Sequence, residues 1–322
     1  MFKIDNVHFV LGLSESMQNV HQLGLRASRS DLPVMITGET GVGKESLARF
    51  IHYQSHRKNS PFLKINCAAL SPQLIESELF GHEKGAFTGA ETIRLGRFEL
   101  ANHGTILLDE INEISPQLQP KLLQVIEDKC FERVGSSFSQ KIDTRIIATC
   151  NQDLKVLVKR GAFRPDLYYR LNVIPIHIES LRKRKEDIIP LVTDFLERNS
   201  GNLTSRNKKI DVETIRVLMD YPWPGNVREL FNLLLRIMAL SDNTDECILP
   251  KHITCFLDKN SIEAPDLKSS LAGLPLAALE KETIQATICH FNGNQHRAAE
   301  CLGISDRTLR NKIRNYAIAI ER

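Results

Sequence analysis

A glycine-rich loop followed by a lysine is the stretch of this chain best suited to chemistry. An apolar run at residues 33–37 leads directly into Gly38-Glu39-Thr40-Gly41-Val42-Gly43-Lys44-Glu45, and a helical pattern follows through Leu47, Phe50 and Ile51. Glycines let successive N–H groups point inward, a helix N-terminus adds positive potential, and a lysine supplies a mobile charge for the β- and γ-phosphates. The order of strand, loop and helix therefore predicts a nucleoside triphosphate site, with a plain tight turn as the alternative.

One residue of this loop departs from the general phosphate-loop pattern. Glu45 follows Lys44, where the pattern has a serine or threonine whose hydroxyl binds Mg²⁺. The metal must then be held elsewhere in the chain. The apolar run 105–108 predicts a strand that ends in two carboxylates, Asp109 and Glu110. Asp109 suits Mg²⁺ and Glu110 suits a base that polarises an attacking water, so ATP and Mg²⁺ are the expected cofactors.

Further polar side chains follow other predicted strands. The run 144–149 predicts a strand that ends at Cys150-Asn151, where the amide of Asn151 can orient water or a phosphate, or merely cap a turn. Arg164 and Arg170 lie six apart among apolar and aromatic residues. They are either arginines on a solvated helix face or donors to the γ-phosphate, a contact that accelerates phosphoryl transfer by roughly 10³- to 10⁵-fold and can come from a neighbouring subunit.

A cation is also predicted in the first turn of a later helix. Asn226 is placed as the N-cap of that helix, and Arg228 follows two residues later. A positive charge at this end opposes the helix dipole, which indicates that Arg228 serves a ligand.

The elements that must position these residues alternate between strands and helices up to about residue 178. This alternation predicts an α/β fold, a parallel sheet flanked by helices, whose ligand lies at the carboxyl ends of the strands. Within residues 1–32 an amphipathic helix is expected, with Met17, Val20, Leu23 and Leu25 on one face. The expected domains are an α/β nucleotide-binding subdomain at 1–178, an α-helical lid at 179–255, a linker at 256–275 and an all-α domain at 276–322.

The last domain has the pattern of a helix-turn-helix. Helices are expected at about 276–290, around 295–301 and from Asp306, with small Ala299 and Gly303 near the turn. Basic side chains on the last helix suit phosphates and guanine edges in the major groove, whereas a solvated helical hairpin is the alternative. The residues expected to contact DNA are Arg307, Thr308, Arg310, Asn311, Lys312 and Arg314.

Composition excludes several other classes of protein. The net charge of +3 comes from 42 basic and 39 acidic residues among 322, so overall charge does not reveal the partners. Seven scattered cysteines without a C-x-x-C pair argue against a disulfide framework or a zinc site. No apolar run approaches the roughly 18 residues of a membrane span, and the N-terminus lacks the pattern of a signal peptide. A cytoplasmic protein without a membrane contact is expected.

A second glycine-bounded stretch has no obvious place in a core. Gly85-Ala86-Phe87-Thr88-Gly89-Ala90 follows Glu78-Leu79-Phe80-Gly81-His82-Glu83-Lys84. Four of its six residues are Gly or Ala, which cannot fill a core, and the other two are an aromatic ring and a hydroxyl. Composition alone also permits an ordinary surface turn.

Taken together, nearly the whole chain resembles the sigma-54-dependent bacterial enhancer-binding proteins, which are ring-forming AAA+ ATPases. The most diagnostic stretch is 85–90, which is similar to the family's loop that contacts sigma-54. The resemblance implies Walker A at 38–45, including its Glu45, and Walker B at Asp109 and Glu110. It also implies sensor I at Asn151, sensor II at Arg228, trans-acting arginine fingers at Arg164 and Arg170, and an asparagine that restrains the Walker B glutamate at Asn66. Cys150 departs from the family, which commonly has Thr there.

The resemblance further implies a mechanism. A hexamer, formed from this chain or with a second type of subunit, would bind enhancer DNA and drive its 85–90 loops against sigma-54, so that the RNA polymerase holoenzyme opens the promoter. Residues 1–32 leave no room for a sensory domain of about 100 residues, so a regulatory protein acting in trans is expected. Two alternatives stay open: an AAA+ remodeller or replication-type DNA ATPase, and a non-enzymatic DNA-binding regulator with a degenerate ATPase.

Overall fold

The chain forms two compact units, residues 1–261 and 262–322, each described here by itself. The computed structural model describes residues 9–69, 72–87, 89–199, 209–240, 247–254, 256–257, 280–281, 283–285, 287–288 and 295–316. Among these residues, no helix is long and apolar enough to cross a membrane.

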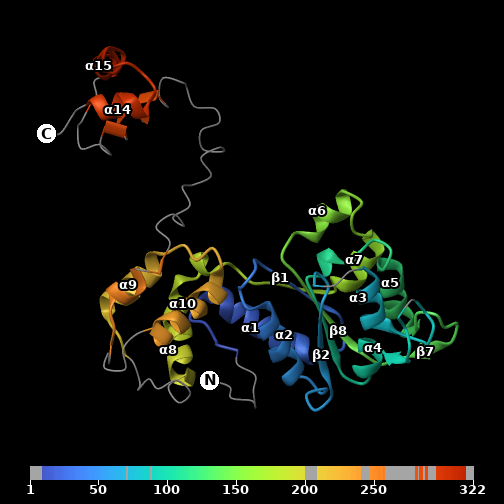
Figure 1. Ribbon diagram of the computed structural model, residues 1–322. Coiled ribbons are helices and arrows are strands. Elements are labelled where there is room, and N and C mark those ends of the chain that lie inside the picture. The colour runs from blue at the N-terminus through green and yellow to red at the C-terminus, as the bar shows by residue number, and fades with distance from the viewer. Residues whose placement is uncertain are drawn as a thin grey trace. The chain divides into compact units, whose positions relative to one another are not determined.

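A five-stranded parallel sheet forms the centre of the first unit (Figure 1). Its strands, in spatial order, are β2 (Phe62–Asn66), β5 (Thr105–Asp109), β8 (Arg145–Cys150), β1 (Val34–Thr37) and β9 (Ile174–His177). Every neighbouring pair is parallel, so all the carboxyl ends lie at one edge. The predicted α/β class is confirmed, and the polar residues that follow β1, β5 and β8 meet at this edge.

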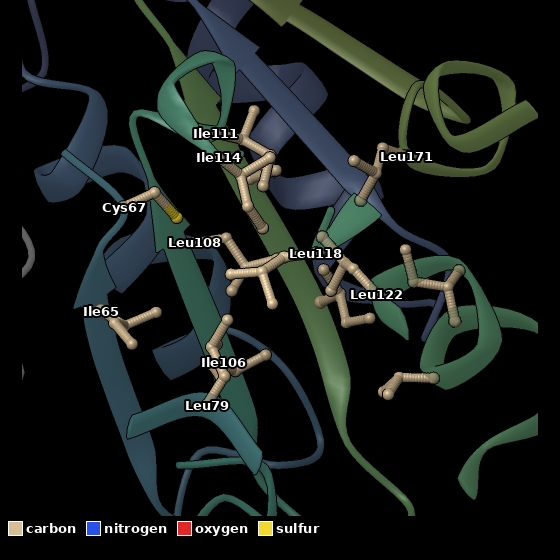
Figure 2. Close-up of a cluster of buried hydrophobic side chains, with 14 of the residues drawn as sticks. Ile65, Cys67, Leu79, Ile106, Leu108, Ile111, Ile114, Leu118, Leu122 and Leu171 are labelled. Atoms are coloured by element: carbon tan, nitrogen blue, oxygen red, sulfur yellow. The ribbon is translucent and has the colours of Figure 1, made fainter. Parts of the chain in front are cut away.

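Alternating side chains of the strands fill two separate cores. Ile36, Leu107 and Ile147 point to the face covered by α1 (Glu15–Ser28) and α2 (Lys44–Tyr53). Their neighbours Met35, Ile106, Leu108, Ile146 and Ala148 point to the other face. Figure 2 shows this second core, in which Ile106 and Leu108 lie near Leu118 and Leu122. The helices that supply it are α3 (Pro72–Phe80), α4 (Arg97–Leu100), α5 (Gln119–Asp128), α6 (Leu154–Lys159) and α7 (Pro165–Leu171).

The N-terminal helix buries the predicted face except at one residue. Met17 and Val20 are buried in α1 and Leu25 packs against the same core, but Leu23 is 40% exposed. Gly24 and Ala27 complete the buried stripe instead. A Cβ at Gly24 would lie 3.3 Å from Leu47 Cδ1, so the small residue lets α1 pack closely on α2. The prediction gave weight to large apolar residues and missed that a close helix contact selects small ones.

Two short antiparallel pairs project from the second face of the sheet. β3 (Gly81–His82) pairs with β4 (Arg94–Leu95), and β6 (Cys130–Glu132) pairs with β7 (Ser139–Lys141). A bridge between His82 and Val134 joins the two pairs. The 310 turn η1 (Ile111–Glu113) follows β5.

The lid is helical, apart from one short strand pair. Its helical segments are η2 (Leu181–Lys183), η3 (Lys185–Asp187), α8 (Ile188–Asn199), α9 (Val212–Asp220), α10 (Asn226–Leu240) and α11 (Pro250–Thr254). The strands β10 (Lys209–Ile210) and β11 (Cys247–Ile248) pair in parallel. The buried Trp223 lies in the lid core, and its indole N–H donates to Leu218 O over 2.7 Å.

Asn226 does not act as the predicted N-cap of its own helix. It is the first residue of α10, has a left-handed φ of 54° and is fully buried. Its Oδ1 accepts from Leu181 N at the start of η2, and its Nδ2 donates to Thr40 O in the phosphate loop. The side chain therefore caps a different element, 45 residues earlier, because tertiary contacts outweigh the local preference of asparagine for its own helix end.

The second unit contains the predicted helix-turn-helix pair. These helices are α14 (Gln295–Cys301) and α15 (Asp306–Asn315), with Gly303 at a φ of 66° between them. A small core holds Ile284, Ile288, Ala298, Ala299 and Leu309. The expected helix at 276–290 is described only at 280–281, 283–285 and 287–288, all of them helical, and the expected linker at 256–275 is described only at 256–257.

Candidate functional site

The glycine loop joins β1 to α2 and cradles the lysine. Lys44 Nζ donates to Gly38 O over 2.6 Å and to Glu39 O over 3.0 Å. The residue is only 8% exposed, and burial lowers the pKa of Lys44 although the charge of Asp109 opposes that shift. Gly43, at a φ of 107°, precedes the first turn of α2. This arrangement presents one ammonium and a helix N-terminus to an anion.

An open cleft of about 390 Å³ lies between this loop, the acid pair and the lid. It collects residues that the sequence analysis took from three separate segments. The predicted residues that line it are Thr40, Gly41, Gly43, Lys44, Glu45, Asp109, Glu110 and Arg228. Ser46, Arg49, Val227, Phe231 and Asn232 also line it and were not predicted. Arg228 reaches the cleft because α10 starts against the loop, where Arg228 N donates to Gly41 O over 3.3 Å.

The two acids at the end of β5 have different surroundings. Asp109 Oδ1 accepts from the Thr149 hydroxyl over 2.5 Å, and its Oδ2 lies 2.8 Å from Lys64 Nζ. Burial raises the pKa of Asp109, but the contacts with Lys64 and Thr149 outweigh burial and lower it. Glu110 has a left-handed φ of 56°, and its N–H donates to Thr149 Oγ1 over 3.1 Å. Within the described residues its carboxylate makes no hydrogen bond or ion pair, so it faces the cleft uncommitted.

The donor set at Asp109 fits Mg²⁺. The carboxylate is a hard oxygen ligand, and Mg²⁺ in such sites usually has one or two carboxylates and completes its shell with waters and phosphate oxygens. Glu45, the residue in place of the usual hydroxyl, is held by Arg49 Nη2 at 2.8 Å and Lys64 Nζ at 2.7 Å. These two cations outweigh burial and lower the pKa of Glu45.

The two predicted asparagines lie at the same sheet edge. Asn66 pairs in register with Asp109 across β2 and β5, but its Oδ1 accepts from Ala68 N over 2.8 Å, and within the described residues it forms no hydrogen bond with Glu110. Asn151 follows β8, and its Oδ1 is buried without a partner among the described residues. Cys150 donates to Gln152 O over 2.9 Å. The hydroxyl that serves this edge belongs to Thr149, one residue earlier than Cys150.

Two loop residues serve the lid and do not line the cleft. Glu39 accepts from Arg182 Nη2 over 2.5 Å and from Asn226 Nδ2 over 3.1 Å, and the Arg182 hydrogen bond lowers the pKa of Glu39. Val42 is buried in the core, and its carbonyl accepts from Arg184 Nη2 over 2.9 Å. Sequence reasoning missed the role of both lid arginines, because they lie about 140 residues after the loop they bind and carry no motif of their own.

The two predicted arginine fingers do not reach the cleft of their own chain. Arg164 Nη2 pairs with Asp166 over 2.7 Å, and Arg170 Nε pairs with Glu127 over 2.6 Å. Neither residue lines the cleft, and both side chains are about half exposed or more. A role at the γ-phosphate would therefore need a second subunit.

The 85–90 loop stands away from the cleft, on the β3–β4 pair. Its backbone closes on itself, with Gly85 N donating to Ala90 O over 2.8 Å. The Phe87 ring is 43% exposed and meets the His82 ring edge-on at 4.9 Å between centroids. Thr88 lies outside the described residues. Arg133 on the neighbouring hairpin contacts Glu83 and Glu99 at 2.8 Å and 2.6 Å, which ties the loop base to the fold.

The predicted DNA-contacting side chains of α15 divide into two groups. Arg307, Arg310, Asn311 and Arg314 are exposed. Thr308 instead serves the helix cap, where its hydroxyl lies 2.8 Å from that of Ser305. Lys312 Nζ lies 2.5 Å from Glu280 Oε1. The exposed group presents three cations on one short helix.

Comparison with known protein families agrees with this arrangement. A model of the sigma-54 interaction domain matches residues 10–177, one of the AAA+ ATPase lid domain matches 182–270, and one of Fis-family bacterial regulatory proteins matches 275–316. The chain belongs to the sigma-54 activator family. This sigma-54 activator is thus an AAA+ ATPase with a helix-turn-helix, as the sequence predicted.

Individual relatives of this sigma-54 activator agree with the family. Regulatory protein AtoC of Escherichia coli (strain K12) is 42% identical over 314 residues, which are 96% of this chain and 68% of AtoC. The Nif-specific regulatory protein of Herbaspirillum seropedicae is 48% identical over 258 residues, 80% of this chain and 47% of that protein. The crystal structure of NtrX from Brucella abortus in complex with ADP matches with a TM-score of 0.71 at 35% identity, covering 97% of this chain and 69% of NtrX. The chain therefore spans between about half and about two-thirds of these proteins' lengths.

Proposed function

We propose that this protein is an ATP-dependent activator of sigma-54 RNA polymerase that binds enhancer DNA and remodels the closed promoter complex into the open one. The observation that carries the proposal is the coexistence of the cleft, with Lys44, Asp109 and Glu110 converging on it, and the loop 85–90, in which Phe87 is 43% exposed. The domains would be 1–178 and 179–255 for the ATPase and 276–322 for DNA, with 256–275 as linker.

Within the cleft, the chain's own residues have separable roles. Residues 38–44 bind the phosphates through backbone N–H groups and the Lys44 ammonium. Asp109 would hold Mg²⁺, which supplies charge neutralisation at the phosphates. Glu110 accepts a proton from the attacking water, because its carboxylate is uncommitted and lines the cleft. Asn151 does not line the cleft, and its unpartnered Oδ1 is buried at the same edge, so a role in orienting that water would require its side chain to turn toward the cleft.

The proposal includes an oligomer whose sites lie between subunits. Arg164 and Arg170 are exposed and lie outside the cleft of their own chain, which suits delivery to a neighbour's γ-phosphate. A closed ring is the assembly in which every subunit both gives and receives such arginines, and we propose a hexamer. Arg164 would then leave Asp166, and Arg170 would leave Glu127, to bind the neighbour's phosphate. This change of partner would couple subunit contact to hydrolysis.

A reconstituted open-complex assay tests this function. We expect Phe87→Ala to keep ATP hydrolysis within about twofold, because Phe87 does not line the cleft, and to lose open-complex formation with sigma-54 polymerase, because its exposed ring is removed. Phe138→Ala is the matched control, since Phe138 is 80% exposed on the adjacent hairpin. Activation retained by Phe87→Ala would refute the loop's role.

The same assay separates the alternative functions. A general AAA+ remodeller would hydrolyse ATP without any dependence on Phe87 or on sigma-54. A non-enzymatic regulator would change transcription equally with ATP and with a non-hydrolysable analogue. If activation requires both hydrolysable ATP and sigma-54 polymerase, the result supports the proposed function and neither alternative.

A further inference from the structure

Lys64 lies between the two acids that flank the expected metal position. Its Nζ lies 2.8 Å from Asp109 Oδ2 and 2.7 Å from Glu45 Oε2. Lys64 belongs to β2, the edge strand, and reaches across to the end of β5 and the start of α2. All three side chains are partly exposed, so the group is accessible from solvent. The sequence analysis assigned Lys64 no role.

Each oxygen of the Asp109 carboxylate already has one protein partner. The Thr149 hydroxyl donates to its Oδ1 over 2.5 Å, and Lys64 is the partner of its Oδ2. Lys64 and Mg²⁺ on the same oxygen would bring two cations within a few ångströms of each other, and their repulsion disfavours binding of both at once. A metal that binds Oδ2 therefore competes with the lysine.

Glu45 supplies a second anchor for the same ammonium. It binds Lys64 through Oε2 and Arg49 through Oε1, over 2.7 Å and 2.8 Å. An ammonium released from Asp109 therefore remains paired and does not become an isolated charge. This contact also gives a reason for a carboxylate after Lys44: Glu45 holds a cation instead of supplying the hydroxyl that the general loop pattern offers to Mg²⁺.

We propose that Lys64 is a built-in counter-cation of the metal site. It holds Asp109 in place when Mg²⁺ is absent, yields Oδ2 when the metal and nucleotide arrive, and stays on Glu45. This inference rests on the proposed ATPase site and makes Lys64 a positioning residue. Its consequence is that Lys64 raises the Mg²⁺ concentration that nucleotide binding requires.

The test compares two substitutions in the full chain, Lys64→Met and Arg49→Met. Each removes one positive charge from Glu45, but only Lys64 contacts Asp109. Binding of a fluorescent ATP analogue is titrated with Mg²⁺ at fixed protein concentration. A charge-assisted hydrogen bond contributes enough that its loss should lower the half-saturating Mg²⁺ concentration roughly tenfold in Lys64→Met. Arg49→Met should shift the half-saturating Mg²⁺ concentration by less than about twofold, which corresponds to less free energy than one hydrogen bond contributes.

Thermal melting gives a second readout that needs no nucleotide. Without Mg²⁺, Lys64→Met should melt below the wild type because Asp109 loses its ion pair while Glu45 keeps only Arg49, and Mg²⁺ alone should recover more of the melting temperature than in wild type. Lys64→Arg restores the charge and should return both readouts toward wild type. If Lys64→Met does not fold, Lys64→Gln, which keeps a donor without charge, should give a smaller shift in the same direction.

The outcomes distinguish this inference from the proposed function. Equal Mg²⁺ midpoints in Lys64→Met and wild type, or equal shifts in both variants, overturn the role of Lys64 while leaving the nucleotide site intact. Failure of the wild-type chain to bind the ATP analogue at any Mg²⁺ concentration would instead refute the proposed function itself.

Discussion

The two ends of the central sheet both gather charged side chains, but only one end is built for chemistry. At the carboxyl end, Lys44, Asp109 and Glu110 line an open cleft. At the amino end, Arg57 and Arg145 lie buried where the strands begin. The contrast shows that a charge cluster indicates function only when some of its atoms remain uncommitted and accessible.

The amino end is closed by one arginine with many partners. Arg57 is only 8% exposed in its side chain, and it donates to Asp31 through Nε and Nη2 over 3.0 Å and 2.8 Å. It also donates to Asp143 Oδ1 over 2.7 Å and to the Gly104 and Asp143 carbonyls. These contacts tie the segments before β1, β2, β5 and β8 together. Its neighbour Arg145, fully buried, donates to Ala27 O over 2.8 Å.

The largest expected effect is on turnover at the carboxyl end. Glu110→Gln should bind ATP normally and lose hydrolysis by roughly 10²- to 10⁴-fold, the usual contribution of a general base. Its melting temperature should stay close to that of wild type, because the Glu110 carboxylate makes no contact within the described residues. Steady-state ATPase and melting curves check both parts, with the exposed Glu113→Gln as control. Normal turnover would overturn the assignment of Glu110.

The amino end should show the reverse, a loss of stability without a loss of site chemistry. Arg57→Met leaves Asp31 and Asp143 without their buried partner and two backbone carbonyls without a donor. Breaking a buried pair costs about 3–5 kcal/mol of unfolding free energy, and we expect the low end of that range because both acids are about half exposed to solvent. Nucleotide affinity of the folded fraction should be unchanged. Urea unfolding measures this difference in the free energy of unfolding. The control is Arg216→Met, which removes an arginine from an exposed ion pair and should stay within about 1 kcal/mol of wild type. If Arg57→Met lowers the free energy of unfolding no more than the control does, the proposed difference between the two ends of the sheet is wrong.

The smallest expected effect is a pH dependence that belongs to the amino end. His52 is buried, with Nδ1 2.9 Å from Thr105 Oγ1, and burial together with the charge of Arg145 lowers the pKa of His52 to about 4. The unfolded chain therefore binds more protons between pH 6.5 and 4, so folding stability falls as the pH drops through this window, by up to about 3 kcal/mol. Unfolding curves should show a weaker fall in His52→Gln.

His177 at the carboxyl end provides the comparison for this pH effect. Its ring is exposed, with Nδ1 3.1 Å from Thr37 Oγ1. His177→Gln is the control, because it removes an exposed imidazole and leaves the buried contact between His52 and Thr105 in place. An equal change in both variants would show that the pH dependence does not arise from burial at the amino end.

Much of the fold and of the cleft followed from the sequence because the relevant residues act in short contiguous runs. The loop 38–45 and the acids after 105–108 each need only a strand and the residues that follow it. Strand ends of a parallel sheet meet at one edge, so these runs converge without knowledge of the packing. The packing of α1 was predicted wrongly at Leu23, since helix contact distance selects small residues that hydrophobic periodicity does not reveal.

The sequence by itself determined the family, the α/β class and most of the residue types that line the cleft. Only the tertiary structure decided that Glu39 binds the lid, that Asn226 caps a distant turn, and that Lys64 bridges Asp109 and Glu45. It also decided that Arg57 closes the opposite end of the sheet. The physical reason is separation along the chain: these partners lie 19 to 187 residues apart in the hydrogen bonds they form, so neither local propensity nor a motif encodes which groups meet.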